Sequence, residues 1–192
     1  MRKFLTLVVI MFSFLSVSAQ KVGIKSNLIS DVALSPNLGL EIGLAKHWTL
    51  DISGQINAWT VNKHKWKHWL AQPELRWWYC ERFQGSFWGI HALGGQFNFG
   101  NIPNHVNFFG YDFSKLGDYR YQGWGAGGGI SYGYAWILSK HWNLEAEIGV
   151  GYVYLMHDTY PACAKCGSKL AEKVHNNYFG PTKLALNIEY LF

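Results

Sequence analysis

After its first twenty residues the chain has no run of 18 apolar residues. A membrane-spanning helix needs about 20 consecutive apolar residues, so this absence excludes a helical membrane protein. Charged residues are sparse, at 15% of the chain, and the formal net charge is only +5. Arg2 and Lys3 contribute to that small surplus. It is too weak to indicate a nucleic-acid partner, and we expect none.

The longest apolar stretch lies at the N-terminus. Arg2 and Lys3 precede an apolar segment from Phe4 to Val17, and small residues at Val17, Ser18 and Ala19 precede Gln20. This pattern predicts a secretory signal peptide over residues 1–19, with a retained membrane anchor as the alternative. No cysteine follows the cleavage site, so a lipoprotein is not indicated. Residues 20–192 have the size of one domain.

Strict alternation of apolar and polar residues marks two segments. From Trp48 to Ala58 the even positions are apolar or Gly and the odd positions are polar. From Trp142 to Tyr154 the even positions are again apolar, while Asn143, Glu145 and Glu147 occupy odd ones. A period of two is typical of a strand with two different faces and does not fit a helix.

Eight strands are predicted on this basis. The chain ends on the last of them, and a terminal strand needs a neighbour, which a closed barrel supplies. Pro73 predicts a bulge or local break in the fourth strand. The fifth strand is ambiguous in phase and is expected to hold a bulge, and the glycines of the sixth are expected to face inward. The predicted ranges are 22–28, 37–44, 48–58, 69–79, 87–99, 124–138, 142–154 and 184–192.

The predicted connections alternate in length. Those at 45–47, 81–86 and 139–141 are short, and those at 29–36, 60–68, 100–121 and 157–178 are longer. This arrangement is typical of outer-membrane barrels, the closed form in which strands can cross lipid. We therefore expect an all-β, eight-stranded antiparallel up-and-down transmembrane barrel with both termini periplasmic. Ten Trp and eleven Tyr agree with aromatic anchoring at membrane interfaces.

Charged residues on the inward faces predict an ion network in the lumen. Eight strands leave an interior that side chains largely fill, and opposite charges can pair there, so a plugged core is favoured over an ion path. No cofactor or metal is expected. His91 is a further candidate for this network. The predicted members are Lys25, Glu41, Asp51, Glu74, Arg76, Glu145, Glu147, Lys183 and Glu189.

The three cysteines leave several interpretations open. Cys163 and Cys166 form a C-x-x-C pair in the last long loop, flanked by His157 and His175. A disulfide, a zinc site and a redox pair all fit, and oxidising surroundings favour the disulfide. Cys80 is expected as a buried free thiol on the lumen face.

Two expected outer loops carry candidate contact residues. Lys63, Lys65 and Lys67 alternate with His and Trp, which fits either an interfacial girdle or contact with lipopolysaccharide phosphates. The segment from Asn101 to Tyr121 is rich in Phe and Tyr, which fits packing over the barrel mouth or a partner surface equally well.

Support for catalysis is thin. No nucleophile motif frames His157-Asp158-Thr159. The leading hypothesis is a non-enzymatic, monomeric barrel that presents loops to lipid, lipopolysaccharide or a surface protein. A lipid-modifying barrel enzyme and a narrow channel are the alternatives.

Several short motifs together resemble one family. Lys25-Ser26-Asn27-Leu28, the segment from Pro36 to Gly43, Trp66-Lys67-His68-Trp69, Gln72-Pro73-Glu74 with Arg76, and Cys80-Glu81-Arg82-Phe83 are similar to those of small Bacteroidetes outer-membrane proteins with a domain of unknown function. The resemblance implies a small barrel of the OmpA/OmpX type, without established catalytic residues. At family level it also suggests an accessory role in the assembly of fimbriae.

Overall fold

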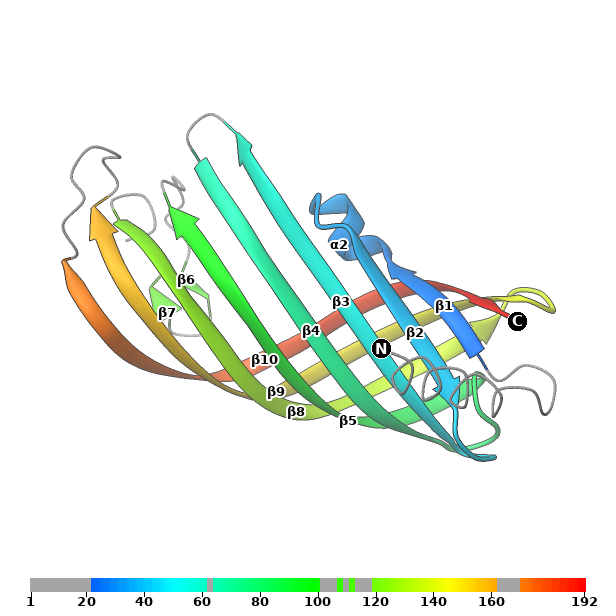
Figure 1. Cartoon of the computed structure of the whole chain (residues 1–192). Coiled ribbons are helices and arrows are strands. Elements are labelled where there is room, and N and C mark those ends of the chain that lie inside the picture. Colours follow the sequence, from blue (N-terminus) through cyan, green and yellow to red (C-terminus); the bar gives the residue numbers. More distant parts are fainter. Residues whose placement is uncertain (1–21, 62–63, 101–106, 109–110, 113–118, 162–169) are drawn as a thin grey trace, which may run out of the picture.

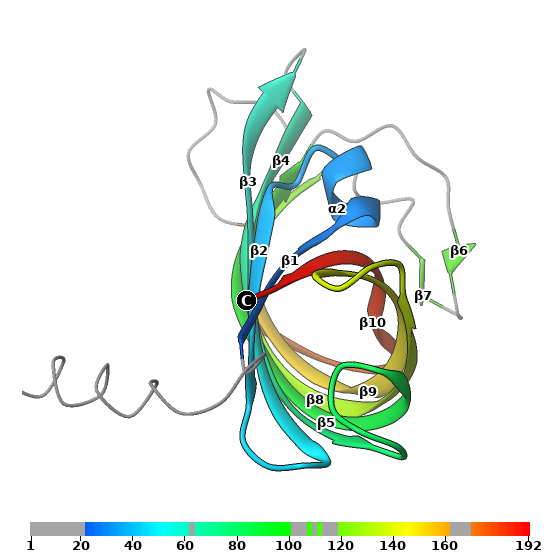
Figure 2. The same ribbon diagram turned by 90° about the vertical axis from the view of Figure 1, so that its right-hand side faces the viewer.

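The computed structural model describes residues 22–61, 64–100, 107–108, 111–112, 119–161 and 170–192. Eight antiparallel strands close into a barrel in the order β1-β10-β9-β8-β5-β4-β3-β2 (Figures 1 and 2). Their bounds are β1 Val22–Asn27, β2 Asn37–Gly43, β3 Trp48–Val61, β4 His64–Trp78, β5 Gly85–Gly100, β8 Tyr119–Ile137, β9 Trp142–Pro161 and β10 Ala171–Leu191. The predicted all-β fold with eight antiparallel strands is confirmed.

Two small elements were not predicted. The helix α2, Leu28–Val32, follows β1, and β6, Asn107–Phe108, pairs with β7, Tyr111–Asp112. No helix among the described residues is long and apolar enough to cross a membrane.

The two ends of the barrel differ in their connections. The turn end carries the connections 44–47, 79–84 and 138–141 together with Val22 and Phe192, and the loop end is opposite. The predicted loop at 60–68 is wrong, because β3 and β4 are joined across residues 62–63 alone. The predicted loops at 100–121 and 157–178 are shortened too, since β8, β9 and β10 extend into them.

The register confirms one predicted irregularity, a local break at Pro73, and corrects the other. β4 keeps one register with β5 on both sides of Pro73, and only the pairing of Gln72 and Pro73 with β5 is interrupted. Pro73 therefore causes a local break without a bulge. The bulge expected in β5 is absent, since the register with β8 is continuous from Gly85 to Gly100. Two register shifts lie instead in β10, one between Ala171 and Val174 and one between Pro181 and Lys183.

A repeated sequence produces a repeated turn. Lys46-His47-Trp48 and Lys140-His141-Trp142 both enter an ascending strand at the turn end. In each copy the Trp carbonyl accepts two backbone N–H groups, and the His Nδ1 lies 2.9–3.1 Å from a carbonyl at the end of a neighbouring strand. The shared residues thus fix the same tight connection twice.

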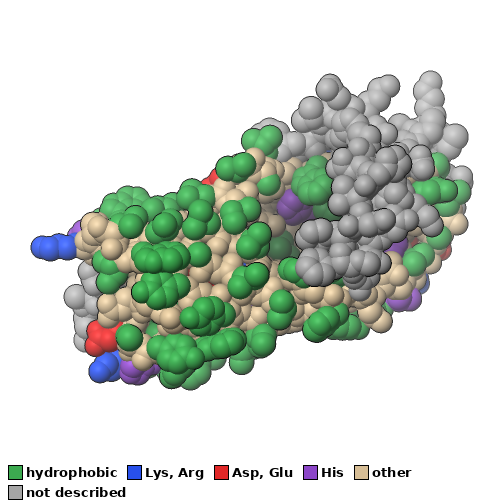
Figure 3. Space-filling model, turned by 180° about the vertical axis from the view of Figure 1, so that it is seen from behind, with side chains coloured by type: hydrophobic (Ala, Val, Ile, Leu, Met, Phe, Trp, Pro, Cys, Tyr) green, Lys and Arg blue, Asp and Glu red, His purple; other side chains and the backbone are tan. Residues whose placement is uncertain are grey.

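The outer surface carries an apolar belt between two aromatic borders. The lower border, near the turn end, is formed by outward Trp side chains. The upper border is formed by Trp69 and Trp124, with Leu and Ile positions between. Figure 3 shows hydrophobic side chains spread over one face of the barrel, with few charged groups among them. The lower border comprises Trp48, Trp77, Trp88, Trp136 and Trp142.

Asn27 joins the short β1 to the much longer β10. Its side-chain Nδ2 donates to the carbonyl of Leu184 at 3.1 Å, and its Oδ1 accepts the N–H of Leu186 at 3.1 Å. The same Oδ1 caps α2 by accepting the N–H of Ile29 at 3.1 Å. The amide therefore continues the strand pairing by one step where β1 ends.

We expect Asn27→Ala to lower the free energy of unfolding by about 1–2 kcal/mol, because it removes a helix cap and leaves edge groups of β10 unpaired. Urea unfolding of the refolded protein in detergent micelles would measure the loss. Ser139→Ala, at an exposed turn position, is the matched control and should stay within about 0.5 kcal/mol. Equal stabilities of the two variants would contradict the assigned role.

Candidate functional site

The nine charged residues predicted for the lumen all lie buried inside the barrel. Alternation places them there, because each occupies an inward position of its strand. β1, β2, β3, β4, β9 and β10 all contribute. The structure brings eight of the nine into one connected ion network, and Glu189 lies beside it.

Arg76 is the centre of this network. Its Nη1 lies 2.6 Å from Glu41 Oε2 and 2.9 Å from Glu145 Oε2. Its Nη2 lies 2.6 Å from Glu147 Oε2 and 3.1 Å from Asp51 Oδ2, and its Nε donates to Glu74. Because β2, β4 and β9 lie on different sides of the ring, these bonds cross the lumen.

Two lysines complete the pairing. Lys25 Nζ lies 2.6 Å from Glu41 Oε2 and 3.3 Å from Asp51 Oδ2. Lys183 pairs with Glu74, and its Nζ lies 3.2 Å from Glu147 Oε2. Among the described residues the buried Lys, Arg, Asp and Glu side chains are three cations, Arg76 and the two lysines, and six carboxylates. The interior is therefore acidic as well as paired.

Neutral polar side chains donate to three of the carboxylates, and these donors were missed from the sequence. Thr49 donates to Glu41, Ser131 donates to Glu74, and Asn187 donates to Glu145. The signal was present, since Thr49 precedes Asp51 by two residues and Asn187 precedes Glu189 by two. The predicted His91 is also buried, and its Nε2 lies 2.8 Å from Thr182 Oγ1 at the bulge of β10.

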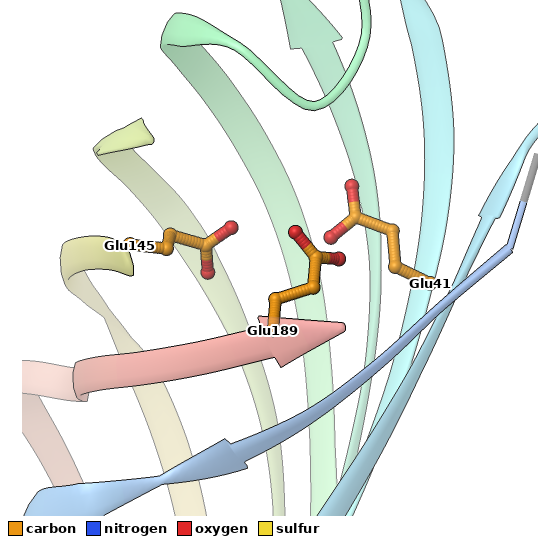
Figure 4. Close-up of side chains that lie close together, drawn as sticks. All are labelled: Glu41, Glu145 and Glu189. Atoms are coloured by element: carbon orange, nitrogen blue, oxygen red, sulfur yellow. The ribbon is translucent and has the colours of Figure 1, made fainter. Parts of the chain in front are cut away.

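Glu41, Glu145 and Glu189 form an acidic cluster toward the turn end. Figure 4 shows their carboxylates turned toward one another, and one oxygen of each lies within 4.8 Å of the others. Glu41 and Glu145 already accept bonds from Arg76, and Asn143 lies 3.4 Å from Glu189 Oε2. The chain's own donors therefore bind Glu41, Glu145 and one oxygen of Glu189, whereas Glu189 Oε1 has no partner among the described residues.

Aromatic side chains close the lumen below the network. Trp78 and Phe87 are fully buried and pack at a ring-centroid distance of 4.6 Å. The Trp78 indole N–H donates to Thr49 Oγ1 at 2.9 Å, and the Arg76 guanidinium lies over the Phe87 ring. Gly133 makes room for Phe87, because a β-carbon there would collide with the ring. A cavity of about 180 Å³ remains on the loop side of the network.

A family model described as a protein of unknown function, DUF3575, matches residues 5–192. The chain belongs to this family. No curated protein and no solved structure matches it. The family description carries no activity, so function has to be argued from the barrel.

Some predicted positions lie elsewhere. Cys80 was expected in the lumen but is exposed and free, because β4 ends at Trp78 and alternation stops with it. Cys163, Cys166 and Lys63 lie outside the described residues. Lys65 and Lys67 belong to β4, so the prediction that they occupy a loop is wrong.

The histidines near the cysteine pair do not face one another. His157 is buried on the inner side of β9, whereas His175 is exposed and contacts Tyr154, an outward position. A zinc site using both histidines is therefore not built. Asp158 faces away from His157 and accepts the N–H of Lys173 at 2.9 Å, so these neighbours form no catalytic pair.

Proposed function

We propose that this family member is a non-enzymatic outer-membrane barrel whose lumen is closed and whose loop end makes contacts at the cell surface. The observation that supports it most is the inversion of polarity across the wall. Large apolar side chains face outward, and the most deeply buried side chains include many charged groups. A soluble barrel has the opposite arrangement, whereas a transmembrane barrel needs this one.

The belt has dimensions that suit a bilayer. From Trp48 to Ile56, next to Trp69, β3 covers the span between the two aromatic borders. A tilted strand crosses a membrane with about 9–11 residues. The signal peptide predicted over residues 1–19 would export the chain, and the turn end with both termini would then face the periplasm. We expect a monomer.

The ion network favours a scaffold over a channel. Arg76 ties β4 to β2 and β9 across the lumen, and Trp78 with Phe87 fills the space below. Residues at the loop end would then make the contacts at the cell surface, with lipopolysaccharide or a surface protein as partner. The accessory role in the assembly of fimbriae, suggested by the family resemblance, is part of this proposal.

Membrane fractionation tests the localisation. We expect the protein in the outer-membrane fraction, migrating faster on gels before boiling than after it, as a closed barrel that resists detergent does. A soluble periplasmic protein with one unchanged mobility would contradict the proposal.

A second experiment tests for enzymatic activity. Lipid A mass spectra from deletion and wild-type cells should be identical, and a changed acyl or phosphate pattern would indicate an enzyme.

Conductance tests the closed lumen. In planar bilayers we expect no single-channel steps from the refolded protein, because the network leaves no continuous water path. An open eight-stranded barrel with a widened lumen would serve as the positive control. Regular conductance steps from the wild-type protein would contradict the plugged interior.

A further inference from the structure

A groove of about 450 Å³ lies at the upper border of the belt. It crosses β3, β4, β5, β8 and β9. Trp69, Gln96 and Trp124 are neighbours in one row across three of these strands, and Lys67, Asn98 and Gln122 form the next row toward the loop end. All six occupy outward positions, because registers are continuous from the belt upward. The groove is therefore placed where a membrane surface would meet water.

The first row offers aromatic surface beside an amide. Trp69 and Trp124 are 46% and 40% exposed, so much of each ring is open for contact. The Trp69 indole N–H donates to Gln96 Oε1 at 3.3 Å, which leaves the amide N–H₂ of Gln96 for another partner. Amphipathic rings of this kind settle at the headgroup level of a bilayer.

The second row adds charge and hydrogen-bonding groups. Lys67 lines the groove and is exposed, and Arg120, in the row above, contacts Gln122 and Tyr160 of the groove lining. Arg120 Nη2 donates to Gln122 Oε1 at 3.1 Å, and its guanidinium stands 4.6 Å above the Tyr160 ring. Two cations thus flank the three amides. Asp158, the acidic residue of the groove lining, is engaged by the Lys173 N–H.

Three buried atoms of this region have no hydrogen-bond partner within the described parts of the chain. His68 Nδ1 belongs to the inner face of β4, and the two on the outer face are Asn98 Oδ1, an acceptor, and Arg120 Nε, a donor. Unsatisfied buried polar atoms are uncommon and costly, so they indicate a missing partner. A ligand that carries both hydroxyl groups and an anionic group would satisfy the two atoms together.

Below the two Trp side chains the outward positions carry only Gly and Ala. Gly54, Ala71, Gly94 and Ala126 form the next row down across β3, β4, β5 and β8. A β-carbon built at Gly94 would meet no atom within 4 Å. The floor is therefore apolar and open, and it leads directly from the polar groove toward the middle of the belt.

We propose that this groove binds the phosphorylated sugar headgroup of an outer-leaflet glycolipid, with an acyl chain over the Gly94 floor. Lys67 and Arg120 would hold the phosphate, as cationic side chains commonly do. The amides of Gln96, Asn98 and Gln122 would bind sugar hydroxyls, and Trp69 and Trp124 would contact the ring. A phospholipid headgroup offers fewer hydroxyls to three amides. The inference rests on the proposed membrane location.

Native mass spectrometry of the refolded barrel in detergent tests the site with three probes. We expect one molecule of bisphosphorylated lipid A to be retained, with weaker retention of dephosphorylated lipid A and of phosphatidylglycerol. Equal retention of phosphatidylglycerol would overturn the assignment to a glycolipid. Retention of all three at random stoichiometry would indicate nonspecific binding and would overturn the site.

Two variants locate the binding. Lys67→Gln should weaken lipid A binding about tenfold, as expected for the loss of one charge-assisted contact. Gly94→Leu should weaken it at least as much by filling the floor, and its β-carbon would meet no atom within 4 Å. Lys46→Gln and Val150→Leu are matched controls on the outer surface away from the groove and should bind as the wild type does.

The outcomes separate this inference from the proposed function. Variants that keep heat-modifiable migration and outer-membrane fractionation but bind lipid A normally would overturn the groove and leave the barrel proposal intact. Loss of membrane fractionation by the wild-type protein itself would overturn the proposed function first.

Discussion

Arg76→Met is expected to lower the free energy of unfolding by about 3–5 kcal/mol, or to prevent refolding. Removing one partner of a buried ion pair leaves the other charges uncompensated, at a cost of this order. Arg76 is fully buried and contacts five carboxylates from four strands. Met keeps most of the side-chain volume, so the loss would report charge and hydrogen bonding more than packing. Urea or guanidinium unfolding in micelles, followed by Trp fluorescence, would measure it.

Lys46→Gln is the control for this prediction. Lys46 Nζ lies 3.9 Å from Glu81 Oε1, and both side chains are mostly exposed. Exposed pairs contribute about 0–1 kcal/mol, so we expect little change. Arg76→Met combined with Glu41→Gln and Glu147→Gln should recover part of the lost stability, because two of the carboxylate charges that Arg76 compensated are then removed. A loss in Arg76→Met no larger than in the control would show that the network does not stabilise the barrel.

The inner and outer faces of the strands were predictable because period two holds within the belt. Leu50 and Ile52 alternate with buried Thr49 and Asp51, as the sequence suggested. Above the belt both faces of the strands carry polar side chains, so the alternation fades although the strand continues. Lys67 and His68, polar neighbours on opposite faces of β4, show this. A loop was predicted there because the alternation stops. Alternation, however, shows whether the two faces of a strand meet different surroundings, and a strand with polar groups on both faces lacks it.

The register shift at Thr182 in β10 explains why the predicted last strand was too short. Leu184 faces outward and pairs with Ile148, whereas Pro181 pairs with Val150. One extra residue, Thr182, reverses the inward and outward positions upstream of it. An alternation followed back from Phe192 therefore fails at the bulge. The carbonyl of Thr182 accepts a bond from Gln72 at 3.1 Å, a contact across the lumen that no local pattern encodes.

The charged site could be predicted residue by residue but not as a geometry. Inward positions followed from alternation, and pairing followed from the cost of isolated buried charge. That Arg76 occupies the centre, with Lys25 and Lys183 on its flanks, depends on how β1, β2 and β10 meet when the ring closes. Closure of the barrel pairs strands that are far apart in the sequence, whereas the alternation within one strand indicates only which face each residue occupies.

Trp77 and Trp78 offer a direct test of this difference between faces, because they are adjacent in sequence. Trp78 is fully buried against Phe87 and Ala135, and Trp77 is 37% exposed on the outer surface beside Tyr79. We expect Trp78→Ala to lower the free energy of unfolding by about 3–5 kcal/mol, from the lost contacts and the cavity left behind. Trp77→Ala should cost about 1 kcal/mol, the order of one aromatic pair contact.

Trp78→Phe separates packing from hydrogen bonding at the same position. It should restore most of the stability lost in Trp78→Ala but not the bond to Thr49, worth about 1 kcal/mol. The Thr49 hydroxyl accepts the Trp78 N–H and donates to Glu41 of the ion network. Loss of the Trp78 bond would therefore also affect the Thr49 bond to Glu41. Conductance should stay absent in Trp78→Ala, since Arg76 still crosses the lumen above the cavity. Equal losses in Trp77→Ala and Trp78→Ala would contradict the assignment of inner and outer faces from which the ion network, the belt and the groove all follow.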